Sequence, residues 1–95
     1  MPWTFQTDNK NCWGEGGWET GERVNIGYNR ENILDCYNDV VSNTKCGSGF
    51  EFNKDDNGWC ACGGKNTANS DCRGNVDPRP HSFVYTITSG SGNTA

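Results

Sequence analysis

Two tryptophans and two glutamates alternate with glycines in one short stretch of the chain, CWGEGGWE. They are Trp13, Glu15, Trp18 and Glu19. An indole ring offers a flat apolar face and one N–H donor, and the C–H face of a pyranose ring stacks well on such a surface. The two carboxylates can accept hydrogen bonds from hydroxyl groups. The stretch therefore predicts a sugar-binding loop, with Trp18 at its centre.

The tryptophans have a second interpretation, as core residues. The chain holds four of them and a single leucine, and a domain poor in aliphatic residues uses indoles to fill its interior. Trp13 stands next to a cysteine and is the strongest candidate for burial, whereas Trp18 is the strongest candidate for exposure. Trp3 and Trp59 complete the set.

Few residues in the sequence could carry out catalysis. His81 is the only histidine, and its neighbour Ser82 projects to the opposite face of a strand, so a serine–histidine pair does not form. Asp55 and Asp56 are adjacent carboxylates, but no sequence feature buries either one to raise its pKa. We therefore expect no enzymatic activity and no cofactor.

The run NKDDNG invites comparison with a calcium-binding loop. Oxygen-bearing side chains stand at Asn53, Asp55 and Asn57, followed by Gly58, as in the first half of an EF-hand loop. The twelfth position, however, is Gly64, where a bidentate glutamate is required. A hairpin turn explains the same residues, so we predict no metal site.

Six cysteines determine the class of the domain. A short, glycine-rich chain with little aliphatic core and six cysteines is typical of a domain held by three disulfides in an oxidising compartment. A zinc site is disfavoured, because the chain has no C-x-x-C motif and one histidine. Six cysteines allow 15 pairings, and the spacing alone does not choose among them. The positions are Cys12, Cys36, Cys46, Cys60, Cys62 and Cys72.

The charge balance excludes two classes of partner. The chain has 8 basic and 12 acidic residues, a formal net charge of −4, and its basic residues are scattered. Nucleic acids and anionic membrane surfaces both require clustered lysine and arginine, so we expect neither as a partner. No apolar run approaches the ~20 residues needed to cross a bilayer, so we expect no membrane insertion.

The elements that position these residues follow from periodicity and turn chemistry. Short strands are predicted from Trp3 to Gln6 and from Arg23 to Ile26. A helix is predicted from about Arg30 to Ser42, with Asn29 as its N-cap. Its apolar face carries Ile33, Cys36, Tyr37 and Val40.

The second half of the chain is predicted to form strands. Phe50 and Phe52 share one face of a hairpin whose return strand places Cys60 and Cys62 on the same face. A last strand is predicted in HSFVYTIT, and the tail at 89–95 has the composition of a flexible linker. The prediction is one α+β domain over residues 1–88, with one helix packed on an antiparallel sheet of four to five short strands.

This order of elements and cysteines resembles the PAN/apple family. A helix bearing Cys36, then Cys46, an aromatic strand GFEF, the motif CAC and a terminal strand FVYTI carry the resemblance. The resemblance implies two nested disulfides, Cys46–Cys60 inside Cys36–Cys62. It also implies an outer bridge, Cys12–Cys72, as in apple-type members.

The resemblance implies a secreted or cell-surface module without catalytic activity. We expect it to recognise carbohydrate or an extracellular glycoprotein, in the manner of a lectin or an adhesion domain. The alternative from a different class is a self-associating subunit of an extracellular filament or matrix. In that case the strand FVYTIT, if it lies at an edge of the sheet, would support strand addition between copies.

Overall fold

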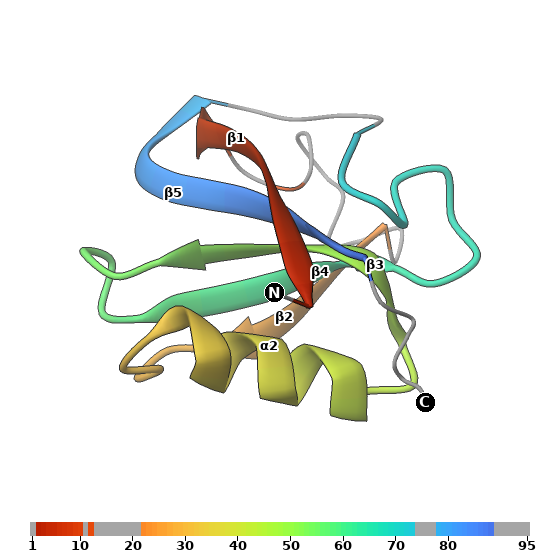
Figure 1. Ribbon diagram of the computed structural model, residues 1–95, viewed down its shortest axis with the longest axis horizontal. Coiled ribbons are helices and arrows are strands. Elements are labelled where there is room, and N and C mark those ends of the chain that lie inside the picture. The colour runs from red at the N-terminus through yellow and green to blue at the C-terminus, as the bar shows by residue number, and fades with distance from the viewer. Residues whose placement is uncertain (1, 11, 13–21, 74–77, 89–95) are drawn as a thin grey trace.

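A five-stranded antiparallel sheet and one helix make up the described part of the molecule (Figure 1). The structure is a computed structural model that describes residues 2–10, 12, 22–73 and 78–88. The elements are β1 (Trp3–Lys10), β2 (Arg23–Gly27), α2 (Ile33–Ser42), β3 (Cys46–Asn53), β4 (Trp59–Gly64) and β5 (Pro78–Ile87). The strands lie in the order β1-β5-β3-β4-β2. The predicted α+β class, with one helix on an antiparallel sheet, is confirmed for these residues; the tail at 89–95 lies outside them.

Helix α2 begins three residues later than predicted. Asn32, not Asn29, is the N-cap, and its side-chain oxygen accepts a hydrogen bond from the backbone N–H of Asp35 at 3.0 Å. Asn29 has a φ of 75° and donates its backbone N–H to the carbonyl of Asn57 at 2.7 Å. A contact with the β3–β4 turn therefore withdraws Asn29 from the helix, and no local pattern reveals such a contact.

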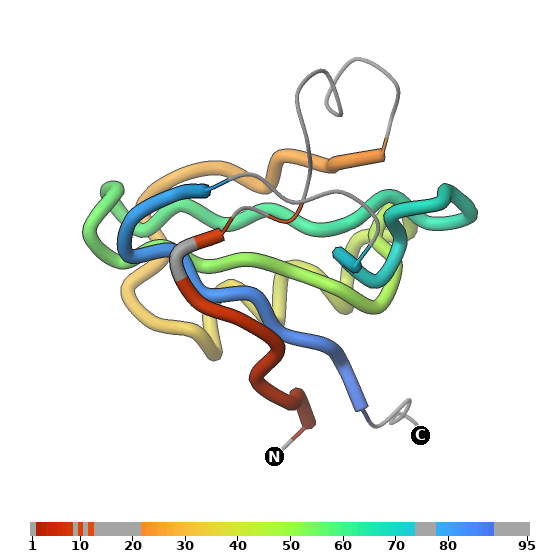
Figure 2. The backbone as a smooth tube through the Cα atoms, turned by 90° about the horizontal axis from the view of Figure 1, so that it is seen from above, coloured from red at the N-terminus to blue at the C-terminus, as the bar shows by residue number. Residues whose placement is uncertain are grey.

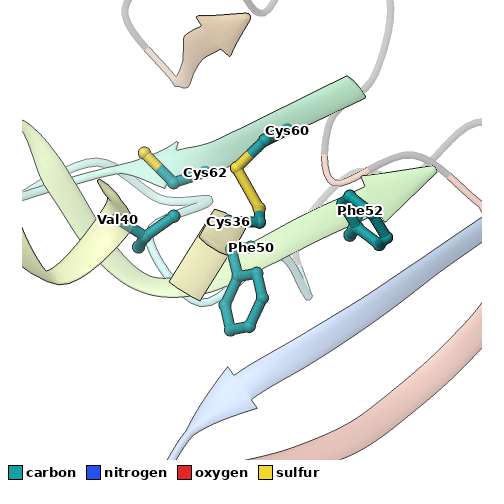
Figure 3. Packing of buried hydrophobic residues seen from close by; sticks show 6 residues of the cluster. All are labelled: Cys36, Val40, Phe50, Phe52, Cys60 and Cys62. Carbon is teal, nitrogen blue, oxygen red and sulfur yellow. A yellow bond between two sulfur atoms is a disulfide. The ribbon is translucent and has the colours of Figure 1, made fainter. Parts of the chain in front are cut away.

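The apolar core lies between α2 and the sheet (Figure 3). Its fully or nearly fully buried members are Cys36, Val40, Phe50, Phe52, Cys60 and Cys62. The first two come from the predicted apolar face of the helix, and the others come from one face of the β3–β4 hairpin, as predicted. Ile33 and Tyr37 pack against this cluster from the helix.

One of the three expected disulfides is confirmed. Cys12–Cys72 is present, but the nested pairing is wrong, because the other bridges are Cys36–Cys60 and Cys46–Cys62. The register of the hairpin gives the reason. Cys46 lies opposite Gly64, so its nearest same-face cysteine on β4 is Cys62, two residues away. Cys60, further along the strand, lies below the first half of α2.

The face of the sheet turned away from α2 is covered by the segment 69–72. The backbone N–H of Gly49 donates to the carbonyl of Ser70 at 2.9 Å. A Cβ atom added at Gly49 would lie 2.3 Å from the carbonyl carbon of Asp71, so this close approach requires glycine. The Cys12–Cys72 bridge packs with Val84 on this face as a second buried cluster. Each face of the sheet therefore has its own disulfide-containing core.

Strand β5 lies inside the sheet, between β1 and β3 (Figures 1 and 2). The strand FVYTIT therefore has no free edge for strand addition, and the edge strands are β1 and β2. Helix α2 packs on β2, β3 and β4, which leaves the β1–β5 half of that face less covered.

Candidate functional site

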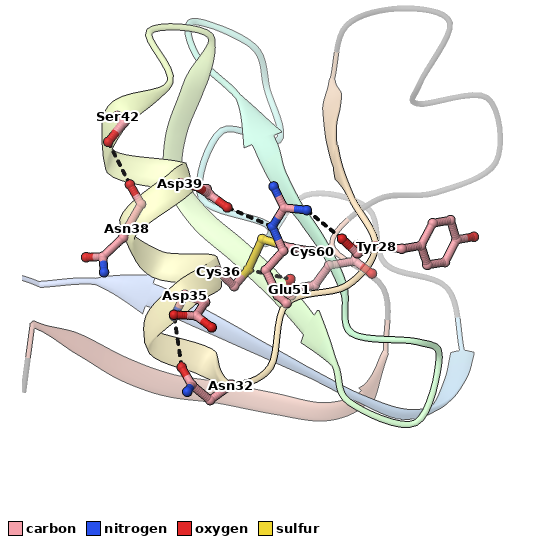
Figure 4. Close-up of polar contacts among 10 residues, drawn as sticks. Tyr28, Asn32, Asp35, Cys36, Asn38, Asp39, Ser42, Glu51 and Cys60 are labelled. Carbon is pink, nitrogen blue, oxygen red and sulfur yellow. Dashed lines mark hydrogen bonds and ion pairs between the residues drawn. A yellow bond between two sulfur atoms is a disulfide. The ribbon is translucent and has the colours of Figure 1, made fainter.

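The chain between β2 and α2 is held on both sides. Arg30 donates from Nε to Asp39 Oδ2 at 2.7 Å and from Nη1 to the carbonyl of Tyr28 at 2.5 Å, which ties this segment to the helix (Figure 4). The backbone N–H groups of Asn29 and Arg30 donate to the carbonyls of Asn57 and Gly58, which ties it to the β3–β4 turn. The backbone of Tyr28 is thus fixed between two structured elements.

The ring of Tyr28 points away from α2 and is 48% exposed (Figure 4). It lies against the half-buried indole of Trp59, with ring centroids 4.9 Å apart and planes inclined by 52°. The guanidinium of Arg23 stands 5.8 Å from the centroid of the Trp59 ring, within the range of a cation–π contact. We call these three residues, Arg23, Tyr28 and Trp59, the Tyr28–Trp59 surface.

A buried carboxylate fixes the orientation of the indole. Glu51 is 0% exposed, and its Oε2 accepts the Nε1–H of Trp59 at 3.1 Å. Its other oxygen, Oε1, accepts the backbone N–H of Cys12 at 2.9 Å. Since both carboxylate oxygens accept a donor from a different segment, Glu51 joins β4 to the chain at Cys12.

Burial dominates the electrostatics of this cluster. Loss of hydration raises the pKa of Glu51, against the opposing effects of its hydrogen-bond donors and of the cations Arg23 and Arg79. Burial also lowers the pKa of Arg23 to about 10, and the neighbouring charge of Glu51 opposes that shift. Arg23 therefore stays cationic at neutral pH, beside a carboxyl group whose charged form is disfavoured.

The arrangement offers groups that can bind a ligand by stacking and by hydrogen bonding. A partly exposed phenol ring on a fixed indole provides a stacking surface, and the flanking guanidinium provides N–H donors. Among the described residues, no three His, Cys, Asp or Glu side chains form a group that could hold a metal ion. In the same residues every cysteine is in a disulfide.

The four residues predicted to form the site, Trp13, Glu15, Trp18 and Glu19, lie outside the described residues. Two residues that flank their segment, Cys12 and Arg23, nevertheless interact with one side chain. Cys12 donates its backbone N–H to Glu51, and Arg23 interacts with Glu51 through its charge. At the second described end the carbonyl of Glu22 accepts the backbone N–H of Gly64 at 2.9 Å, at the opposite end of β4 from Trp59, and it is the Arg23 side chain that reaches toward the Trp59 ring.

Sequence reasoning missed Tyr28, Arg23 and Glu51 as site residues. One signal was present in GFEFN, where Glu51 stands between two core phenylalanines and so faces the other side of the strand. Its burial could not be read from that pattern, because the segments that cover it are distant in sequence.

Two oxygen-bearing side chains of the turn that resembles a calcium loop, Asn53 and Asp55, contact other parts of the protein. Asn53 is buried, accepts the backbone N–H of Asp56 at 3.2 Å and donates its amide to the carbonyl of Pro80 at 3.2 Å. Asp55 lies 3.4 Å from the exposed ring of His81. These contacts are those of a side-chain-capped hairpin turn.

A recess lies between β2 and α2, with a volume of about 420 Å³. Its charged groups, Arg30 and Asp39, are paired with each other. The remaining polar lining consists of amide and hydroxyl side chains: Asn25, Ser42, Asn43 and Thr44. Its lining residues include no aromatic side chain.

No family model, curated protein or solved structure matches this chain. The PAN/apple resemblance thus rests on the order of elements and cysteines in the sequence. In the described ranges, the structure has no helix long and apolar enough to span a membrane.

Proposed function

We propose that this chain is a non-catalytic extracellular module of PAN/apple type that binds carbohydrate or a glycoprotein. The observation that carries the proposal is the exposed Tyr28 ring resting on Trp59, whose indole is held in place by Glu51. Stacking on a sugar ring requires an aromatic face that is accessible and fixed in orientation, since a fixed ring loses little conformational freedom on binding.

The disulfides support the proposed extracellular location. Three disulfides in a domain of 95 residues fit an extracellular location, where such bonds form and persist. Cys12 and Arg23, which flank the tryptophan-rich loop, both interact with Glu51. The proposed site therefore includes Trp13, Trp18, Glu15 and Glu19, on the evidence of the sequence. The proposal therefore places one binding region over the loop and the Tyr28–Trp59 surface.

The test is a glycan array with the fully oxidised domain, followed by titration of each hit with tryptophan fluorescence as the signal. We expect Tyr28→Ala to weaken the hits by about tenfold, the loss of one stacking contact of roughly 1.4 kcal/mol. Tyr28→Phe keeps the ring and should bind within about twofold of the wild type.

Phe83→Ala is the matched control, because Phe83 is similarly exposed, at 40%, and belongs to β5 rather than to this surface. The proposal fails if the array gives no hit at millimolar sugar. It also fails if Tyr28→Ala and Phe83→Ala bind alike, since the aromatic surface would then have no specific role.

The alternative, a self-associating filament or matrix subunit, loses its proposed contact because β5 lies inside the sheet. Sizing across a concentration series distinguishes it from the binding module. A head-to-tail subunit would grow with concentration, whereas a binding module would remain at one size.

A further inference from the structure

β1 is an edge strand of the sheet, and among the described strands it pairs with β5 alone. The backbone N–H of Thr88 donates to the carbonyl of Pro2 at 2.9 Å. Hydrogen-bonded and non-hydrogen-bonded pairs alternate along an antiparallel ladder, so Thr4 is the next residue bonded to β5. The backbone N–H and C=O groups of Trp3 and Phe5 therefore point outward, away from the sheet.

The side chains beside this edge are apolar on the face that carries α2. Phe5 is 55% exposed and lies 6.2 Å, centroid to centroid, from the ring of Phe83, which is 40% exposed. The helix packs on the other half of the sheet and leaves these rings accessible. An edge with open backbone groups and exposed rings can accept an added strand.

The same edge borders a positively charged hollow of about 450 Å³. We call it the β1 groove; its lining residues are Phe5, Gln6, Thr7, Lys10, Cys72 and Arg73. Within the described ranges, neither Lys10 nor Arg73 forms an ion pair. The carboxylate of Asp71 accepts the backbone N–H of Arg73, not its guanidinium. Among the described residues, the groove thus carries two cations without an ion-pair partner, in a chain whose net charge is −4.

Register shifts divide the strand into two parts with different chemistry. They fall between Phe5 and Thr7 and between Asp8 and Lys10. Before the first shift, the edge offers regular backbone groups and the Phe5 ring. Beyond it, the groove offers the two cations. The groove is therefore suited to a ligand that is an extended chain at one end and negatively charged at the other.

We infer that the β1 groove docks an extended acidic segment of another protein. The segment adds as a strand along Trp3–Phe5, places an apolar side chain on Phe5 and Phe83, and sets its carboxylates against Lys10 and Arg73. A second copy of this chain meeting edge to edge would bring Lys10 and Arg73 of both copies to one interface, where like charges repel. An acidic polysaccharide would leave the outward backbone groups of β1 without strand partners.

The probe is a capped eight-residue peptide with four glutamates at one end and four alternating threonine and valine residues at the other. Two versions are made, one with the glutamates first and one with the glutamates last. Binding to the oxidised full chain is measured calorimetrically at low salt, and amide NMR signals report the contact. One order of the peptide should bind and shift the amide signals of Trp3 and Phe5. Affinity should fall as salt rises, because two ion pairs contribute.

Charge-reversal variants identify the groove. Lys10→Glu and Arg73→Glu should each weaken binding by about tenfold, whereas Lys65→Glu, the same change at an exposed site beyond β4, should change it by less than about twofold. N-methylation of alternate amides in the peptide should abolish binding, and this result does not depend on any variant folding.

Several outcomes overturn the inference. They are an absence of binding by either peptide at millimolar concentration, equal loss in Lys65→Glu and Arg73→Glu, and undiminished binding of the N-methylated peptide. A fourth is concentration-dependent dimerisation of the free chain that shifts the Phe5 amide signal, because the occupant would then be a second copy.

Discussion

Glu51 and Trp59 are diagonal neighbours across the β3–β4 pair, and a carboxylate with no solvent exposure accepts the N–H of a half-buried indole. The cross-strand partner of Trp59 is Asn53, two residues beyond Glu51. This diagonal relationship lets a residue buried beneath one face of the sheet control the orientation of a ring at its margin. The stability of the fold and the geometry of the proposed site therefore depend on the same hydrogen bond.

Removing that bond should destabilise the domain. In Trp59→Phe a ring remains but the donor is lost, and one oxygen of a buried carboxylate is left without its partner. We expect the free energy of unfolding to fall by about 1 to 3 kcal/mol, measured by denaturant titration. The control is Trp3→Phe, which also reduces an indole to a phenyl ring. The indole of Trp3 packs on Tyr37 and Phe50 and, within the described residues, donates no hydrogen bond. Equal losses in the two variants would contradict this prediction.

The raised pKa of Glu51 should make stability depend on pH. Burial raises the pKa in the folded chain above its ordinary value of 4.5, so the folded state keeps a proton that the unfolded chain has released. The stabilising contribution is fully present below about pH 4.5 and is lost as pH rises through the folded-state pKa. The free energy of unfolding should therefore decline over this window in the wild type.

Glu51→Gln should remove this decline, because the amide does not titrate, although it should also cost one hydrogen bond. Denaturant titrations at a series of pH values measure the slope. Glu31→Gln serves as the control, since Glu31 is exposed and the variant should keep the wild-type slope. A decline that persists unchanged in Glu51→Gln would assign the pH dependence to another group.

The disulfide pairing makes a sharp prediction about free thiols. Cys36→Ala/Cys60→Ala removes one complete bridge and should show no free thiol in a thiol-reagent assay. Cys36→Ala/Cys62→Ala breaks two bridges and should show two reactive thiols or a non-native bond. If the first variant instead shows two reactive thiols or a non-native bond, and the second shows none, the nested pairing would be correct. Loss of the single bridge should cost about 2 to 4 kcal/mol.

Gly58 is expected to resist substitution. It has a φ of +69°, and an added Cβ would lie 2.1 Å from the carbonyl oxygen of Arg30. Gly58→Ala should lose at least about 2 kcal/mol of stability by thermal or denaturant unfolding. It should also weaken glycan binding, because the contact between this turn and the Tyr28 segment is disturbed. Ser48→Ala, at an exposed position on β3, should change neither quantity.

The helix and hairpin could be predicted because their signals are local. The spacing of Ile33, Cys36, Tyr37 and Val40 fixes which face of a helix is apolar, whatever the helix packs against. Alternation likewise places Cys60 and Cys62 on one face of β4. The start of the helix could not be predicted in this way, because the backbone of Asn29 is committed to the turn at Asn57.

The disulfide partners and the site depend on distances along the sheet. Whether Cys46 meets Cys60 or Cys62 follows from the β3–β4 register; the spacing does not determine it, and the pairing that the family resemblance implied was wrong. The exposed Tyr28 ring depends on contacts from α2 and from the β3–β4 turn, and the burial of Glu51 depends on Cys12, which lies 39 residues away. Such contacts emerge only when the elements are assembled.

The two ends of the segment 13–21 are attached to the framework independently of its sequence. Cys12 is fixed by its bridge to Cys72 and by its bond to Glu51, and the other end enters β2 at Arg23. Recognition loops that diversify on a constant scaffold need anchor points of this kind. Substitutions between these anchors should therefore leave the Cys12–Cys72 bridge and the β2–β4 pairing in place. Randomising these nine positions would turn the fold into a display framework.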